Sequence, residues 1–165
     1  ICYMPAYGIA SASTALVGQN VGAGQWKRAK SFGKVTGWIG VGLTAILALA
    51  MFLWSDTLGK AFSSDLEVAL LSGEMLRIVS VAEPMFSMST VMSGALRGAG
   101  EAKYPFYVGI ICMLCIRVSL GAILLFGFQL GLSAVWIAMA VDLNLRGIAN
   151  YLHFIHGKWI PAETK

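Results

Sequence analysis

The chain has 165 residues, of which 58% are hydrophobic and only 12% are charged, whereas an ordinary soluble domain carries about 25% charged residues. The formal net charge of +4 lies in short breaks between apolar runs and not along one exposed face, which argues against binding to nucleic acid. This composition excludes a soluble enzyme and favours a membrane protein.

Five apolar stretches follow one another along the chain, and each is a candidate membrane-spanning helix because a span needs about 20 mostly apolar residues. They are residues 1–17 (a partial span), 35–54, 68–95, 104–126 and 130–151, followed by a polar tail at 152–165. The short alternating segments of a β-barrel are missing. The expected fold is therefore all-α, a polytopic transmembrane helix bundle. Because Ile1 opens inside an apolar stretch, we expect the chain to be truncated at its N-terminus.

Positive charge alternates from one break to the next. The first and third breaks and the tail are rich in basic residues, which are Lys27, Arg28, Lys30, Lys34, Arg97, Lys103, Lys158 and Lys165. The second break has one lysine against three acids, and the fourth has no charge. Since Lys and Arg mark cytoplasmic loops, this pattern predicts a multi-pass protein of the plasma membrane whose first and third breaks and C-terminus face the cytoplasm.

Two glycine-rich breaks, LVGQNVGAGQWKRA from Leu16 and ALRGAGEAKYP from Ala95, each follow an apolar helix. Glycine permits positive φ there and hence a tight chain reversal. A phosphate-binding loop is the alternative, but the terminal Lys-Ser/Thr is absent. Gly94 and Gly98, four residues apart, predict close helix packing. Cys112 and Cys115 are expected to be small hydrophobic residues, and we expect no metal site.

Glu83 is the sharpest candidate site residue, because it lies near the middle of the third apolar stretch and precedes Pro84, which is expected to kink the helix. A carboxylate at that depth is a candidate for binding a proton or a sodium ion as the coupling ion. Arg117 is its expected partner. Glu83 and Arg117 each lie fourteen residues from the near end of the break between their stretches, so regular helices would hold them at similar depth. A structural Glu83–Arg117 ion pair is the alternative to a coupling role.

Asp142 and Arg146 are four residues apart, on one helical face, a spacing that favours pairing. They form either a buried structural pair or an acidic contact for a cationic drug. Glu74 and Arg77, one turn apart, are expected to be structural.

Met85, Met88 and Met92 recur at three- and four-residue spacing and share one helix face. Flexible thioethers suit surfaces that accept varied apolar ligands, so these residues are candidates for contact with substrate. A packing stripe is the alternative. His153 and His156 are expected at the membrane interface, and no cofactor is expected beyond the coupling ion.

Three stretches resemble the multidrug and toxic compound extrusion (MATE) family, in the order seen in its second half. They are Pro5–Ala29, Glu83–Pro105 and Val141–Trp159, and the LVGQ–GAG and LRGAG–P pair is the specific part. The resemblance implies a C-lobe of a two-lobe, twelve-helix transporter, at about helices 8 to 12, whose N-terminal lobe is missing here. Some sodium-using members carry an acid near the position of Phe86, where this chain has none.

The resemblance implies a proton- or sodium-coupled antiporter that exports drugs or other cationic amphipathic compounds. Its partners would be membrane lipid, a small-molecule substrate and the missing lobe. Two alternatives remain. A flippase for lipid-linked precursors, from the same broad superfamily, would need a large basic cavity. A membrane assembly subunit without transport activity would carry few charges at membrane depth.

Overall fold

Helices make up nearly all of the computed structural model, which describes residues 3–62, 65–129, 131–157 and 159–161. Within these ranges there is no strand, and the all-α expectation is confirmed. In chain order the elements are α1 (Tyr3–Gly22), α2 (Trp26–Leu53), α3 (Ser55–Phe62), α4 (Leu66–Gly98), α5 (Lys103–Ile111), η1 (Cys112–Val118), α6 (Ser119–Ala122), η2 (Ile123–Gly127) and α7 (Leu132–His156). The segments η1 and η2 are π-helical, and together with α5 and α6 they form one continuous rod, Lys103–Gly127.

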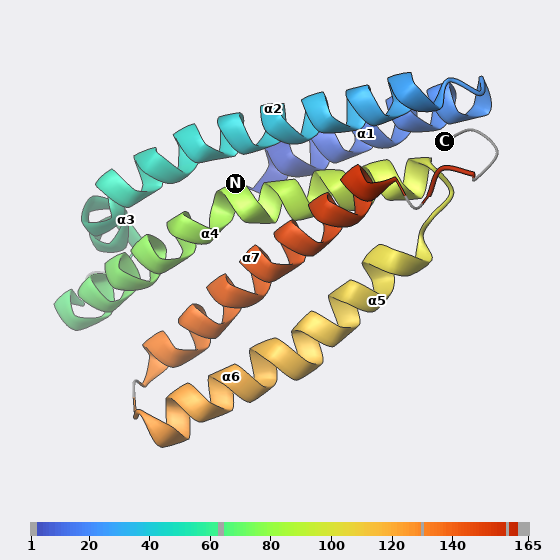
Figure 1. Cartoon of the computed structure of the whole chain (residues 1–165). Helices are drawn as coiled ribbons and strands as arrows, with labels where there is room; N and C mark the ends of the chain where they lie inside the picture. The colour runs from blue at the N-terminus through green and yellow to red at the C-terminus, as the bar shows by residue number, and fades with distance from the viewer. Residues whose placement is uncertain (1–2, 63–64, 130, 158, 162–165) are drawn as a thin grey trace.

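Helix α4 is the centre of the bundle and packs against α1, α2, α3 and α7. The rod packs mainly against α7, which lies between α4 and the rod (Figure 1). Pro84 stands inside α4 and has no N–H to donate to the preceding turn. Figure 1 shows α4 changing direction about midway along its length, as the sequence predicted for this proline.

Small residues bring α1 and α4 into backbone contact. A Cβ on Gly94 would lie 2.6 Å from the Ala10 carbonyl oxygen, and one on Gly98 would overlap the Thr14 carbonyl oxygen. The Thr14 hydroxyl donates a hydrogen bond of 2.9 Å to the Gly94 carbonyl oxygen. Close approach of this kind substitutes for the hydrophobic effect, which supplies little driving force between helices in lipid. The packing role predicted for Gly94 and Gly98 is confirmed.

The two glycine-rich breaks adopt the same turn. Gly24 has a φ of 71° and Gly100 a φ of 87°. In both, the glycine N–H donates to the carbonyl three residues back and the next N–H donates to the carbonyl five residues back, at 3.0 and 2.8 Å. This is the Schellman arrangement, which satisfies the last carbonyls of a helix through a left-handed glycine. The predicted positive φ at these glycines is confirmed.

The turns after α1 and α4 and the end of α7 lie at one end of the bundle, and α3 and the turn before α7 lie at the other (Figure 1). Because α1 ends at Gly22 and α2 begins at Trp26, the basic residues expected in the first break occupy the first turns of α2. The basic residues of the first and third breaks thus lie at the same end of the bundle, where α7 also ends, while Lys158 and Lys165 of the tail lie outside the described residues.

Among the described residues, three helical segments are long and apolar enough to cross a membrane by length and composition: α2, the rod and α7. Only 6% of the most apolar window of the rod is buried inside the bundle, and large apolar side chains such as Phe126 are exposed on it. An apolar surface of this extent suits a lipid environment. Helix α4, also expected to span, carries polar residues such as Ser80, Ser87 and Ser89, which are buried against other helices.

Candidate functional site

Glu83 is buried in α4, with 3% of its surface exposed. Its Oε2 atom is buried and has no hydrogen-bond partner among the described residues. An unpartnered buried carboxylate oxygen is costly, and such a group marks a functional site more often than a purely structural one. Glu83, which the sequence singled out, thus has a buried oxygen without a hydrogen-bond partner among the described residues.

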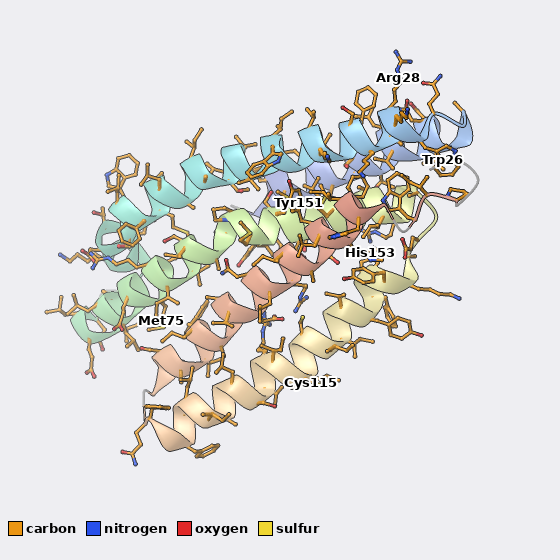
Figure 2. All side chains as sticks on the ribbon, viewed as in Figure 1. Trp26, Arg28, Met75, Cys115, Tyr151 and His153 are labelled. Atoms are coloured by element: carbon orange, nitrogen blue, oxygen red, sulfur yellow. The ribbon has the colours of Figure 1, made fainter. Side chains whose placement is uncertain are left out.

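Glu83 also lines a cavity of about 560 Å³, towards the end of the bundle that holds α3. Met75 and Val79 of α4 line it, as do Leu132 and Trp136 of α7. Met75 lies between these two helices (Figure 2). The volume is in the range of small-molecule sites, which are mostly apolar with a few polar groups. Glu83 is the one carboxylate among the described lining residues.

Asp142 on α7 is the centre of a second charged group. Its carboxylate is fully buried and lies 2.7 Å from Arg146 and 2.9 Å from Arg117. The Nη2 atom of Arg146 donates to both Asp142 oxygens, at 2.9 and 2.7 Å. The predicted Asp142–Arg146 pair is confirmed. With two guanidiniums on one carboxylate, the cluster carries a net positive charge.

The expected Glu83–Arg117 pair is wrong, because Arg117 binds Asp142 instead. The expectation assumed that α4 and the following helix are regular neighbours. Helix α7 lies between them (Figure 1), and Arg117 stands in the π-helical segment η1. A π-segment has more residues per turn and so turns the following side chains towards a different face.

Glu74 and Arg77 bind different partners, both in other helices. Arg77 pairs with Asp56 at 2.6 Å and donates to the Ser55 hydroxyl at 2.9 Å, which ties α3 to α4. Glu74 accepts a hydrogen bond of 3.3 Å from Ser133. These contacts favour the structural interpretation of both residues.

The methionines are buried to different degrees. Met88 and Met92 are 2% and 0% exposed and belong to the hydrophobic core with Phe154, while Met85 packs against that core from its edge. Their burial favours the packing stripe over direct contact with substrate. Cys112 is buried, and Cys115 is exposed and points away from the bundle (Figure 2).

Sequence reasoning missed two polar groups formed by residues far apart in the chain. His153 Nε2 lies 2.9 Å from Glu101 Oε1, and its ring stacks on Tyr104 at 3.5 Å. In addition, Arg97 and Arg146 line one small cavity. Arg97 had been placed only among the charges of a break. The spacing of residues along the chain does not predict either group, because each group joins residues from two helices.

A family model described as MatE matches residues 1–123 of the chain. The chain belongs to this family. The resemblance of the three motifs is thereby confirmed. Among curated relatives, it is 30% identical over 160 residues to a probable multidrug resistance protein NorM of Thermotoga maritima, covering 96% of the chain and 34% of that protein. It is 26% identical to multidrug and toxin extrusion protein 1 of Oryctolagus cuniculus, over 86% of the chain and 25% of that protein.

Among solved structures, the chain matches a crystal structure of the eukaryotic MATE transporter AtDTX14. The TM-score is 0.89 at 22% identity, over 96% of the chain and 35% of that protein, which supports the fold. The MatE chain thus spans about a quarter to a third of the length of the relatives it matches. It belongs to a family of multi-pass membrane transporters and not to an enzyme family.

This MatE chain departs from the sodium-using pattern at Phe86. The Phe86 ring packs edge-on against Tyr3 and Tyr7 of α1, with centroids 4.7 and 6.1 Å away. An aromatic wall therefore stands where the resemblance places an acid in some members. Glu83, on the preceding turn of α4, is the nearest carboxylate in the chain sequence.

Proposed function

We propose that the chain is the C-lobe part of a cation-coupled antiporter of the plasma membrane that exports drugs or other cationic amphipathic compounds. The rest of the transporter, including an N-terminal lobe, completes the transport pathway. The C-terminus faces the cytoplasm, in keeping with the basic residues gathered at that end of the bundle. The names of the relatives support drug export, and the coupling ion is a proton or sodium.

One observation carries the role of Glu83 in this proposal. Its buried carboxylate has an oxygen without a partner and lines a mainly apolar cavity large enough for a small molecule. The single negative charge of Glu83 can be offset either by the coupling ion or by a cationic ligand, so binding of one weakens binding of the other. Competition at Glu83 would couple inward ion flow to outward drug movement.

The flippase alternative calls for a large basic cavity. The Glu83 cavity has a carboxylate and no basic side chain among its described lining residues. The export of a cationic compound therefore suits this cavity better than the transfer of a phosphate-bearing lipid.

The test uses the full-length parent protein in proteoliposomes with an imposed pH or sodium gradient. Efflux of a fluorescent cationic dye is compared between the unchanged protein and Glu83→Gln. Glu74→Gln is the matched control, since it makes the same chemical change on the exposed face of the same helix. We expect gradient-driven efflux to be lost in Glu83→Gln and kept in Glu74→Gln. Full efflux by a correctly inserted Glu83→Gln protein would remove Glu83 from the coupling site.

A further inference from the structure

A second cavity, of about 230 Å³, lies where α1, α4, α5 and α7 meet. Arg97 and Arg146 line it together with Ser89, Ser93 and Asn150. Its described lining residues include two guanidiniums and no carboxylate. The cavity is therefore cationic and polar, unlike the cavity beside Glu83.

The donors of this cavity are only partly used within the protein. Arg146 holds Asp142 through Nη2, and its buried Nε has no partner. Arg97 donates from Nε to the Ser93 carbonyl oxygen at 3.2 Å, which leaves its two terminal nitrogens for a ligand. Asn150 is held by hydrogen bonds from Nδ2 to Ser89. Its buried Oδ1 is an unpartnered acceptor that suits a hydroxyl or N–H of the same ligand.

The surrounding charges leave the cavity short of negative charge. Asp142 neutralises one of the two arginines it contacts, Arg117 and Arg146, and Arg97 adds a further positive charge. The acid Glu101 is not among the described residues that line the cavity, and its Oε1 atom lies 2.9 Å from His153 Nε2. The excess positive charge attracts an anion by Coulomb interaction, so it favours an anionic group in the cavity.

The shape of the cavity indicates how a ligand would lie. Its volume is below that of whole drug-sized sites, so it accommodates one end of a molecule. Tyr7 and Arg97 also line a neighbouring cavity of about 570 Å³, which extends along α1 past Ser11 and Thr14. Tyr7 and Phe86 supply aromatic walls at the junction. A ligand with an anionic end and a flat aromatic body fits this arrangement.

We propose that this cavity binds the carboxylate of an aromatic amphipathic compound, with Arg97 and Arg146 as the cationic contacts. The site recognises a negative charge, whereas the Glu83 cavity is proposed to recognise a positive one. It is separate from the Glu83 cavity, so binding here does not depend on ion coupling at Glu83.

The test measures binding to the full-length parent protein in detergent, by fluorescence anisotropy. The probes are tetramethylrhodamine, which has a free carboxylate, and its methyl ester, which lacks that charge. We expect the free acid to bind about tenfold more tightly than the ester, as a hydrogen bond to a charged group allows. Arg97→Gln and Arg146→Gln should each remove most of this preference and change ester binding by less than about twofold.

Lys103→Gln is the matched control, because Lys103 is an exposed cation near Arg97 in the chain that does not line the cavity. It should keep the preference for the free acid. Arg146→Gln can disturb Asp142. Arg97 is exposed, and its hydrogen bond among the described residues goes to a backbone carbonyl. The Arg97→Gln result therefore decides the test if Arg146→Gln misfolds. The proposal would be overturned if the unchanged protein bound the free acid and the ester with equal affinity. It would also be overturned if Arg97→Gln weakened binding of both dyes equally.

A lipid phosphate is the other source of an anion. The titrations are repeated in nanodiscs of phosphatidylcholine alone and with phosphatidylglycerol. A preference for the free acid in both supports a soluble carboxylate ligand. Its loss with phosphatidylglycerol would assign the cavity to lipid and overturn the proposal. Glu83→Gln should leave the preference intact, which separates a failure of this site from a failure of ion coupling.

Discussion

Arg117 in η1 and Asp142 in α7 form an ion pair of 2.9 Å, in which the carboxylate is fully buried and the arginine side chain is 29% exposed. It is a polar link between the outer rod and α7, as is the hydrogen bond of 3.3 Å from the Tyr104 hydroxyl to the Ala149 carbonyl oxygen. Arg146 shares the same carboxylate oxygen at 2.7 Å. Removal of Asp142 would leave two guanidiniums without their counterion, whereas removal of one arginine would leave a balanced pair.

We therefore expect Asp142→Asn to lower the free energy of unfolding of the full-length protein by about 3 kcal/mol, as for other broken buried ion pairs. Denaturant titration of the purified protein in detergent would measure it. Arg117→Gln should cost clearly less. The double variant Asp142→Asn with Arg117→Gln should be more stable than Asp142→Asn alone. A double variant as unstable as the sum of the two would contradict this charge balance.

The Asp56–Arg77 pair makes a contrasting prediction. Its side chains are 54% and 48% exposed, and exposed pairs contribute about 0–1 kcal/mol because water and salt screen them. Asp56→Asn should thus lower the free energy of unfolding by less than about 1 kcal/mol. The same titration, run at low and high salt, measures it. A loss as large as that of Asp142→Asn would mean that α3 is held chiefly by this one pair.

The backbone contact of α1 with α4 predicts a sharp glycine effect. Gly98→Ala would push a Cβ against the Thr14 carbonyl oxygen, and neither backbone can yield by changing a rotamer. We expect a loss of about 1–3 kcal/mol, the usual cost of overpacking. Gly8→Ala in α1 is the matched control, because a Cβ there meets nothing within 4 Å. Thermal unfolding in detergent compares the Gly98→Ala and Gly8→Ala variants. Equal melting temperatures would contradict a close backbone contact between α1 and α4 at Gly98.

The proposed orientation can be checked with single cysteines in the full-length protein, after the native cysteines are replaced. Arg28 and Lys60 are both exposed. Arg28 lies at the start of α2 and Lys60 near the end of α3, so they lie towards opposite ends of the bundle. With the C-terminus in the cytoplasm, a membrane-impermeant maleimide added to intact cells should label Lys60→Cys and spare Arg28→Cys. The reverse labelling would invert the proposed topology.

Local patterns were enough to predict the features that depend on nearby residues. The Asp142–Arg146 pair follows from a four-residue spacing, and the turns at Gly24 and Gly100 follow from glycine at a helix end. The change of direction about midway along α4 is in keeping with Pro84 inside that helix, which has no N–H to donate. Each involves one helix or one turn, where the chemistry is set by the sequence itself.

Contacts between helices were harder to predict. Arg117 was matched to the wrong acid because the count of residues assumed a regular helix beside α4, while the chain has a π-segment and α7 comes between. The convergence of Arg97 and Arg146 on one cavity likewise depends on how α4 and α7 cross. The order of helices in space is a tertiary property that charge and hydropathy along the chain do not encode.

At Gly94 and Gly98 the backbones of α1 and α4 lie against each other, and the Thr14 hydroxyl bonds across the boundary. The two helices would have to separate before one could slide along the other. We therefore expect α1 and the C-terminal half of α4 to move together as one rigid unit. We expect the hinge of this movement at Pro84, the residue that follows Glu83 in the chain. A displacement of the C-terminal half of α4, which ends near Arg97, would then change the position of Met75 in the other half. The width of the apolar cavity that Met75 lines would change with it.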